Sequence, residues 1–289
     1  MRLEQQRASG NIDDRRGRRV PGGAGGGLGL GAIVIVLLIS WMTGADPQSL
    51  LQLAGGSTGG GAGDAPMERG TSGAPADAQG LFVSRVLGST EDAWERVFAS
   101  GGQRYQAPTL VLFDDAVQSA CGTNSSAVGP FYCPADQQVY IDLTFFRQLD
   151  EEFGAPGDFA QAYVVAHEVG HHVQTLLGVS RQVTAARQRA DEAEGNRLSV
   201  LQELQADCFA GVWAHHAGNR QLLEPGDIEE GLRAAAAIGD DTLQRRAGRH
   251  VAPESWTHGS AEQRALWLRR GLTEGTLEAC DTFGQSRRR

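Results

Sequence analysis

Two histidines and a glutamate carry the spacing in this sequence that is best suited to chemistry. His167 and His171 are four positions apart, and Glu168 directly follows the first histidine. On an α-helix, side chains at i and i+4 project from one face about 40° apart, so both imidazoles can bind one zinc ion. The carboxylate of Glu168 then flanks the metal, where it can take a proton from water and later protonate a leaving amine. The pattern therefore predicts a zinc centre that hydrolyses an amide bond.

A catalytic zinc centre needs a third protein ligand and one open position. The long motif of the metzincin proteases would place glycine at position 174 and histidine at 177, but Gln174 and Leu177 stand there, which excludes that class. Another helix offers Glu203, with Asp207 at i+4 among apolar neighbours that indicate a half-buried face. We expect Glu203 to bind zinc and Asp207 to hold a ligand histidine in the correct tautomer. The alternative is a solvated acidic face. Two rival ligands lie in a more polar run: Glu192 and Glu194.

The other histidines have weaker claims to a metal. His172 points about 100° away from His171 on the helix, so we expect it to pack or to form hydrogen bonds behind the ligands. His215, His216 and His250 have no partners at ligand spacing. We interpret these three as structural residues.

The elements that must hold these residues are mainly helical. The metal-binding helix is predicted over residues 159–177, where an apolar stretch precedes His167. Further elements are a helix over Thr90–Phe98 capped by Ser89 or Thr90, strands over Thr109–Phe113 and Gln138–Leu143, and an irregular or edge segment over Gly129–Pro134. Nearly everything after residue 144 indicates helix. The predicted fold class is therefore α+β, helix-dominant and zincin-like, with a small β-sheet.

The first 80 residues differ from the rest in composition. Residues 28–45 form an uncharged apolar stretch that just spans a bilayer as a helix, and the arginines before it favour a cytoplasmic amino terminus. A cleavable secretory signal is the alternative, and both interpretations export the domain. Residues 46–80 are rich in small and polar residues, which predicts a disordered, flexible linker. We therefore expect a cytoplasmic tail over 1–27, a transmembrane anchor over 28–45, a linker over 46–80 and an extracytoplasmic metallopeptidase domain over 81–289.

Charge restricts the partners. The chain has a formal net charge of -9, although its first 20 residues hold more arginines than acidic residues, so the remainder is more acidic than the whole. Such a domain is poorly suited to nucleic acid. We expect a peptide or protein substrate, contact with a membrane through one transmembrane helix, and no nucleic-acid partner.

Four cysteines allow three disulfide pairings if the domain is exported and oxidised. We favour Cys121 with Cys133, which would close the loop beside the segment over Gly129–Pro134, and Cys208 with Cys280, which would tie the helix of Glu203 to the carboxyl terminus. A second zinc site is the rival interpretation, but the sequence contains no Cys-x-x-Cys spacing.

Beyond the zinc motif, the chain resembles the neutral zinc metallopeptidases of bacteria, which begin with a basic segment, one transmembrane helix and a low-complexity linker. The resemblance extends over almost the whole chain. It rests on five stretches: Ala166–Gln174, Glu203–Trp213, Ile238–Asp241, Thr257–Arg264 and Cys280–Phe283. It implies zinc as the cofactor and peptide hydrolysis as the activity, without naming a substrate.

The stretch from Glu203 to Asp207 is also similar to the third-ligand motif of gluzincin-type membrane proteases related to the CaaX-prenyl protease and heat-shock protein X. Those proteins carry Thr-His-Pro-x-x-x-x-Arg downstream, and Thr257–Arg264 is similar, with Gly259 in place of the proline. The similarity implies that His258 and Arg264 line the cleft and stabilise the oxyanion during attack on a carbonyl, which makes His258 a second candidate catalytic residue. Alternatively, His258 only caps the helix that begins near Ser260.

Taken together, the sequence predicts peptide hydrolysis by one zinc ion bound to His167, His171 and Glu203, with Glu168 as the general base. Two other functions stay open. The first is a membrane-tethered zinc-binding assembly or adaptor protein without proteolytic activity, which an intact Glu168 disfavours because a structural site has no use for a general base. The second is a zinc hydrolase that cleaves a non-peptide amide.

Overall fold

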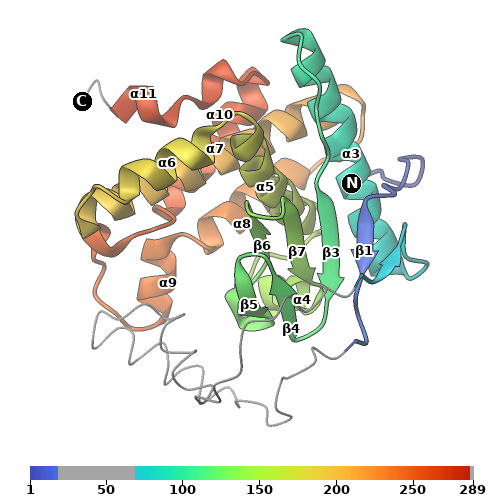
Figure 1. Ribbon diagram of the computed structural model, residues 1–289, viewed down its shortest axis with the longest axis horizontal. Helices are drawn as coiled ribbons and strands as arrows, with labels where there is room; N and C mark the ends of the chain where they lie inside the picture. Colours follow the sequence, from blue (N-terminus) through green and yellow to red (C-terminus); the bar gives the residue numbers. More distant parts are fainter. Residues whose placement is uncertain (19–68, 287–289) are drawn as a thin grey trace. The chain divides into compact units, whose positions relative to one another are not determined.

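The structure is a computed structural model that describes residues 1–18 and 69–286 (Figure 1). It contains a five-stranded sheet. Its strand order is β2 (Thr71–Ser72), β1 (Ile12–Asp14), β3 (Thr109–Phe113), β7 (Gln138–Asp142) and β6 (Phe131–Cys133). The three inner strands run parallel, and β2 and β6 pair antiparallel at the two edges. Both strands expected from β-branched and aromatic residues are confirmed as β3 and β7, and the segment around Gly129–Pro134 contributes the edge strand β6.

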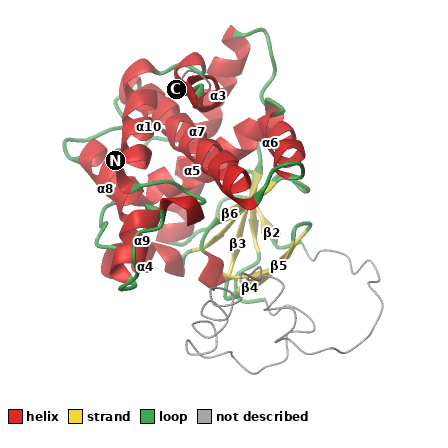
Figure 2. Ribbon diagram, turned by 90° about the vertical axis from the view of Figure 1, so that its left-hand side faces the viewer, coloured by secondary structure: helices red, strands yellow, loops and turns green. Residues whose placement is uncertain are grey.

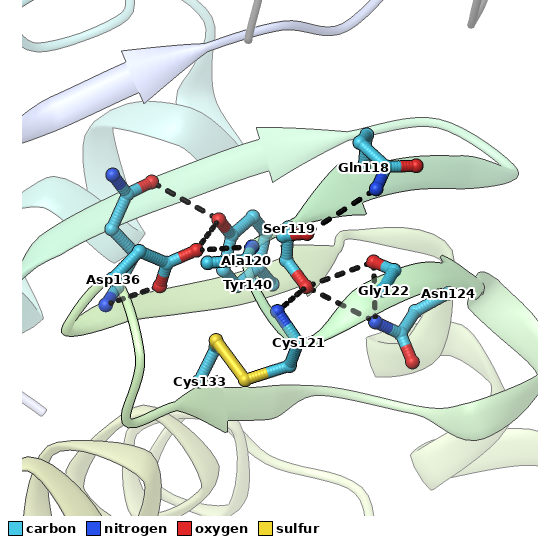
Figure 3. The surroundings of a disulfide bond; sticks show 10 residues. Gln118, Ser119, Ala120, Cys121, Gly122, Asn124, Cys133, Asp136 and Tyr140 are labelled. Carbon is cyan, nitrogen blue, oxygen red and sulfur yellow. Dashed lines mark hydrogen bonds between the residues drawn. A yellow bond between two sulfur atoms is a disulfide. The ribbon is translucent and has the colours of Figure 1, made fainter. Parts of the chain in front are cut away.

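A hairpin beside the sheet is joined to its edge by a disulfide. The hairpin consists of β4 (Ala116–Ser119) and β5 (Gly122–Ser125), and Cys121 in its turn is bonded to Cys133 of β6. Figure 3 shows the Asp136 carboxylate beside this bond, where it accepts hydrogen bonds from the Tyr140 hydroxyl and the backbone N–H of Ala120. The hairpin, the edge strand and β7 are therefore held as one rigid group.

Most helices lie above the strands in the view of Figure 2, while α4 and α9 lie beside them, and the predicted helix-dominant α+β fold class is confirmed. They are α3 (Ala78–Ser100), α4 (Thr144–Glu151), α5 (Asp158–Leu176), α6 (Val179–Arg187), α7 (Glu192–Asn219), α8 (Asp227–Ala237), α9 (Asp240–Arg246), α10 (Ala261–Glu274) and α11 (Thr282–Ser286). The helix expected to begin near Thr90 in fact begins at Ala78 with Asp77 as its cap, and Thr90 is buried inside it. A Ser-Thr pair favours caps, but here the Thr90 hydroxyl donates to the Leu87 carbonyl instead.

Glycines let the three central helices approach closely. A side chain at Gly170 of α5 would place its Cβ 2.9 Å from the Ala206 carbonyl oxygen of α7. Where α7 crosses α10, a Cβ at Gly271 would lie 1.9 Å from the Cys208 carbonyl oxygen, a distance no real contact allows. The predicted disulfide between Cys208 and Cys280 is present and ties α7 to the segment that follows α10. The relative positions of α5 and α7 are thus fixed by backbone contact.

The amino terminus differs from the expected tail over residues 1–27. Residues 1–18 belong to the same compact unit as residues 69–286. β1 pairs with β3, the Ser84 hydroxyl donates to the Ser9 carbonyl, and the buried Glu91 carboxylate accepts from the side chains of Ser9 and Asn11. Arginine and glycine content made this segment resemble a tail, because its partners lie some 80 positions away and leave no local pattern.

The expected linker over 46–80 also ends earlier than predicted, since β2 pairs with β1 and α3 begins at Ala78. The expected transmembrane stretch over 28–45 lies outside the described residues. Among the helices that are described, none is both long and apolar enough to cross a bilayer.

Candidate metal centre

Two histidines of α5 and one glutamate of α7 bring their side-chain nitrogen and oxygen atoms close together. The Nε2 atom of His167 lies 3.1 Å from Oε2 of Glu203, and Nε2 of His171 lies 3.3 Å from Oε1 of the same carboxylate. One ligand atom from each of the three residues lies within 4.8 Å of the other two. The structure therefore brings together the three residues that the sequence nominates as ligands.

The donor set fits zinc. Zinc bonds of about 2.0–2.1 Å in a tetrahedron place neighbouring ligand atoms about 3.3 Å apart, which is close to both measured separations. Two imidazoles and one carboxylate leave a fourth position open, as in catalytic sites. Burial opposes ionisation of Glu203, but the two histidines outweigh it and hold the pKa of this carboxyl well below its usual range. Glu203 is thus available as an anionic ligand.

Asp207 orients His167 from behind. Its carboxylate is fully buried and lies 2.9 Å from Nδ1 of His167. Arg264 donates to both of its oxygens, at 2.8 Å from Nε and 3.0 Å from Nη2, and the Tyr163 hydroxyl donates as well. Burial raises the pKa of Asp207, but Arg264 and His167 outweigh this and lower it to about 2. Because the ionised carboxylate only accepts, Nδ1 of His167 carries a proton, and Nε2 is the nitrogen that could bind a metal.

A glutamine plays the matching role for His171. The side-chain oxygen of Gln174 lies 2.9 Å from Nδ1 of His171, and its amide nitrogen donates to the Gln202 carbonyl at 2.7 Å and to the Gln205 side chain at 3.1 Å. The amide nitrogen is therefore turned toward α7 and the amide oxygen toward the histidine. His171 must then donate from Nδ1, which leaves its Nε2 free for the metal.

Glu168 lies beside the ligands on the wall of the same cleft, and only 8% of it is exposed. Burial raises the pKa of its carboxyl above the ordinary value, although the neighbouring histidines oppose the shift. A more basic carboxylate is a better proton acceptor near neutral pH. This position and environment suit a general base.

His258 and Arg264 have different environments, although both line the cleft. Nδ1 of His258 lies 3.2 Å from Asp240, and its imidazole is half exposed. Burial lowers the pKa of His258, but Asp240 and Glu203 outweigh it and raise the pKa. The guanidinium of Arg264 is buried, and it donates to the Asp207 carboxylate, the Tyr163 hydroxyl and the Ile238 carbonyl. The helix that follows is capped by Ser260, not by His258.

His172 links α5 to the edge strand β6. Its Nε2 lies 2.6 Å from the Gln106 carbonyl oxygen, which can only accept, so this nitrogen carries the proton. Burial lowers the pKa of His172, so the ring is neutral and its Nδ1 accepts from the Tyr132 hydroxyl at 3.1 Å. The contact fixes β6 beside α5. The predicted role of His172 outside the ligand set is therefore borne out by its contacts.

A cleft of about 680 Å³ opens above the ligands. Its walls come from β6 and the turn before it, from α5, and from the facing parts of α6, α7 and α9. The volume is typical of a ligand-binding site in an enzyme. Among the described residues, this cleft contains all three ligands together with Glu168 and His258.

Two contributors to the centre were not identified from the sequence. Tyr163 stands one turn before His167 and Gln174 stands three residues after His171, so helical spacing alone places both on the ligand face. That spacing was the available signal. The role of Arg264 had no such signal, because it depends on α10 crossing α7.

Comparison with known sequences gives the class of the protein. The chain belongs to the family described as "Putative neutral zinc metallopeptidase", whose model matches residues 1–283. Among its relatives, the Escherichia coli (strain K12) protein YpfJ is 45% identical over 99% of this chain and 100% of the relative. The Mycobacterium tuberculosis (strain H37Rv) protein Rv2575 is 45% identical over 72% of this chain and 73% of the relative. Both are described as uncharacterized, and no solved structure matches the chain.

Proposed function

We propose that the protein is a zinc-dependent metallopeptidase that hydrolyses peptide bonds, with Glu168 as the general base. One observation carries the proposal: Nε2 of His167, Nε2 of His171 and the carboxylate of Glu203 converge within 4.8 Å at the floor of a cleft that Glu168 also lines. Zinc held by these three residues would lower the pKa of water and polarise a substrate carbonyl. The family supports a hydrolase of this kind.

The residues around the ligands divide the remaining work. Glu168 accepts a proton from the attacking water and delivers it to the leaving amine. Asp207 and Gln174 hold the two imidazoles in the tautomers that present Nε2. His258 lines the same cleft and is half exposed, so in its protonated form it can donate a hydrogen bond to the developing oxyanion.

The edge strand β6 offers a place for the substrate backbone. It pairs only with β7 among the described strands, so its other edge can accept an extended peptide by strand addition. The Phe131 ring stacks on Tyr140 with centroids 4.7 Å apart, and Tyr132 is held by His172, so the strand is rigid. Recognition through the backbone would make the enzyme weakly selective for sequence. An unchanged peptide KM after replacement of both aromatic residues would count against this placement.

The decisive experiment compares the full-length protein with Glu168→Gln. The zinc-loaded wild type should degrade an unfolded protein substrate, whereas Glu168→Gln should bind zinc with the same stoichiometry and be inactive. Glu203→Gln should lose zinc. Glu192→Gln, which changes an exposed glutamate at the start of α7, is the matched control and should keep both zinc and activity.

The competing functions give different results in the same assay. A zinc-binding adaptor would show equal, background proteolysis in the wild type and in Glu168→Gln. A hydrolase of non-peptide amides would leave the protein intact but would cleave another amide in a substrate screen, and would lose this activity in Glu168→Gln.

The location of the protein is likewise a proposal. Two disulfides within the described residues favour an oxidising, extracytoplasmic compartment for the domain. Attachment through residues 28–45 rests on the sequence alone. Residues 1–18 pack into the same unit as the domain, and a single membrane crossing by residues 28–45 would separate the two. We therefore propose that the amino terminus lies on the same side of the membrane as the metal centre, in place of a cytoplasmic tail joined to the domain by one transmembrane helix.

A further inference from the structure

The two ends of the cleft differ in chemistry. Beyond Glu168 toward the start of α5, the lining is made of apolar side chains that are mostly half-buried. We call these six residues the apolar end: Val128, Phe145, Phe153, Val164, Ile238 and Leu243. Toward α6 the lining is polar and includes Ser180, Thr184, Ser199, Gln202 and the exposed Arg187. Half-buried apolar groups gathered on one wall of a cleft mark a binding surface.

The apolar end is built from several elements, so it is a shaped pocket and not the apolar face of a single helix. Phe145 of α4 and Phe153 have ring centroids 6.3 Å apart, and Gly129 packs against Phe145 from the turn before β6. Leu243 comes from a further element, α9. The Arg246 guanidinium lies 5.9 Å from the centre of the Phe153 ring and donates to its carbonyl, which fixes this ring in place.

Its distance from the reacting centre follows from helix geometry. Val164 precedes Glu168 by four residues, so the two side chains lie on one face of α5, about 6 Å apart along the axis. An extended peptide advances about 3.3 Å per residue. A substrate side chain in the apolar end therefore belongs to a residue within one or two positions of the bond beside Glu168.

We propose that this pocket makes the enzyme select peptides with a bulky apolar residue, such as phenylalanine or leucine, at one fixed position next to the cleaved bond. The inference rests on the proposed peptidase function and adds its substrate class. The polar end imposes no comparable demand for an apolar side chain, because its hydroxyl and amide groups and the exposed Arg187 guanidinium can exchange their hydrogen bonds with water. Burial of one large apolar side chain should favour phenylalanine over glycine at this position by at least about tenfold.

A binding measurement tests the pocket separately from catalysis. The probe is a set of labelled peptides of alanine, serine and glycine in which a single phenylalanine is moved through each position, plus the peptide without it. Binding to full-length, zinc-loaded Glu168→Gln is measured by fluorescence anisotropy. Peptides with phenylalanine should bind at least about tenfold tighter than the peptide without it. Equal affinity across the set would overturn the proposal, even if the wild type proves to be a peptidase.

Two variants from different elements locate the preference. Leu243→Ala and Phe153→Ala should each reduce the preference for phenylalanine to about threefold or less, because each removes one wall of the pocket. Leu266→Ala is the matched control, since this leucine of α10 is 60% exposed and does not line the cleft. In wild-type digests, the cut should follow the phenylalanine at a constant spacing. A preference that survives both cleft variants, or a cut that ignores the phenylalanine, would contradict the assignment.

Discussion

The buried pair of Asp207 and Arg264 makes the sharpest prediction about the metal centre. Asp207 is fully buried, and only 2% of Arg264 is exposed, so replacing one partner strands the other charge away from water. At an effective dielectric constant of about 20, two charges about 4 Å apart attract by about 4 kcal/mol. Breaking a buried pair of this kind typically costs about 3–5 kcal/mol. We therefore expect Asp207→Asn to lower the free energy of unfolding by that amount.

The pair also separates stability from metal affinity. Asp207→Asn should weaken zinc binding by about 10–100-fold, because the His167 ring loses the anion that orients it. Arg264→Met should cost a similar amount of stability but much less zinc affinity, since Asp207 still contacts His167 at 2.9 Å. In the double variant no charge is stranded, so its loss of stability should be smaller than the sum of the two single losses by about 2 kcal/mol or more.

Urea unfolding of the metal-free protein and zinc titration against a competing chelator measure the two quantities. The control is Glu194→Gln, whose side chain and that of its partner Arg197 are 44% and 48% exposed, and which should change the unfolding free energy by less than about 1 kcal/mol. Losses that add within about 0.5 kcal/mol, or an Asp207→Asn variant with native zinc affinity, would refute this account of the network.

Three further predictions concern protons, disulfides and the amino terminus. In the metal-free protein, burial lowers the pKa of His167, but Asp207 and Glu203 outweigh it and raise the pKa to about 10. Zinc binding at pH 7 should therefore release at least one proton, which calorimetry in buffers of different ionisation enthalpy would detect. These contacts also stabilise the metal-free protein; the stabilisation is complete below about pH 6.5 and is lost as the pH rises through about 10. The Cys208–Cys280 disulfide closes a loop of 72 residues, and replacing both cysteines by serine should lower the free energy of unfolding by about 4 kcal/mol. The same change at Cys121–Cys133, which closes 12 residues, should lower it by about 3 kcal/mol. Equal urea midpoints for the two variants would contradict the dependence on loop length. Gly10→Cys and Leu266→Cys should react with a membrane-impermeant maleimide from the same side of a membrane, because both positions belong to one folded unit, and labelling from opposite sides would disprove that arrangement.

Sequence spacing predicted which residues come together in the candidate metal centre because their geometry is local. His167 and His171 lie on one helix, and Glu203 and Asp207 repeat the same four-residue interval on another, so the helical period alone places each pair on one face. That the two helices meet was predicted from the requirement of a catalytic zinc site for a third protein ligand. Strands β3 and β7 were equally legible, since they are short and rich in β-branched and aromatic residues.

The errors arise where a segment depends on distant partners. Residues 1–18 carry a tail-like composition, and only the contacts of β1 with β3 and of Ser9 with Glu91 make them part of the domain. Arg264 lies in a motif that is similar to one found in membrane proteases, yet its guanidinium reaches Asp207 because α10 packs on α7 through Gly211 and Gly271. No periodicity along the chain encodes such a crossing.

The contacts that hold α5 and α7 together also bear on whether a zinc ion at this site would be catalytic or structural. α5 and α7 meet through Gly170 and the backbone of Ala206, and Gln174 bridges them with hydrogen bonds. The disulfide of Cys208 fixes α7 independently of any ion. Structural zinc sites are typically needed where the chain cannot otherwise fold, and they fill all four positions with protein ligands. Within the described residues, protein contacts hold the two helices, ligand atoms of His167, His171 and Glu203 converge, and the buried carboxylate of Glu168 lines the same cleft; together these favour chemistry over architecture.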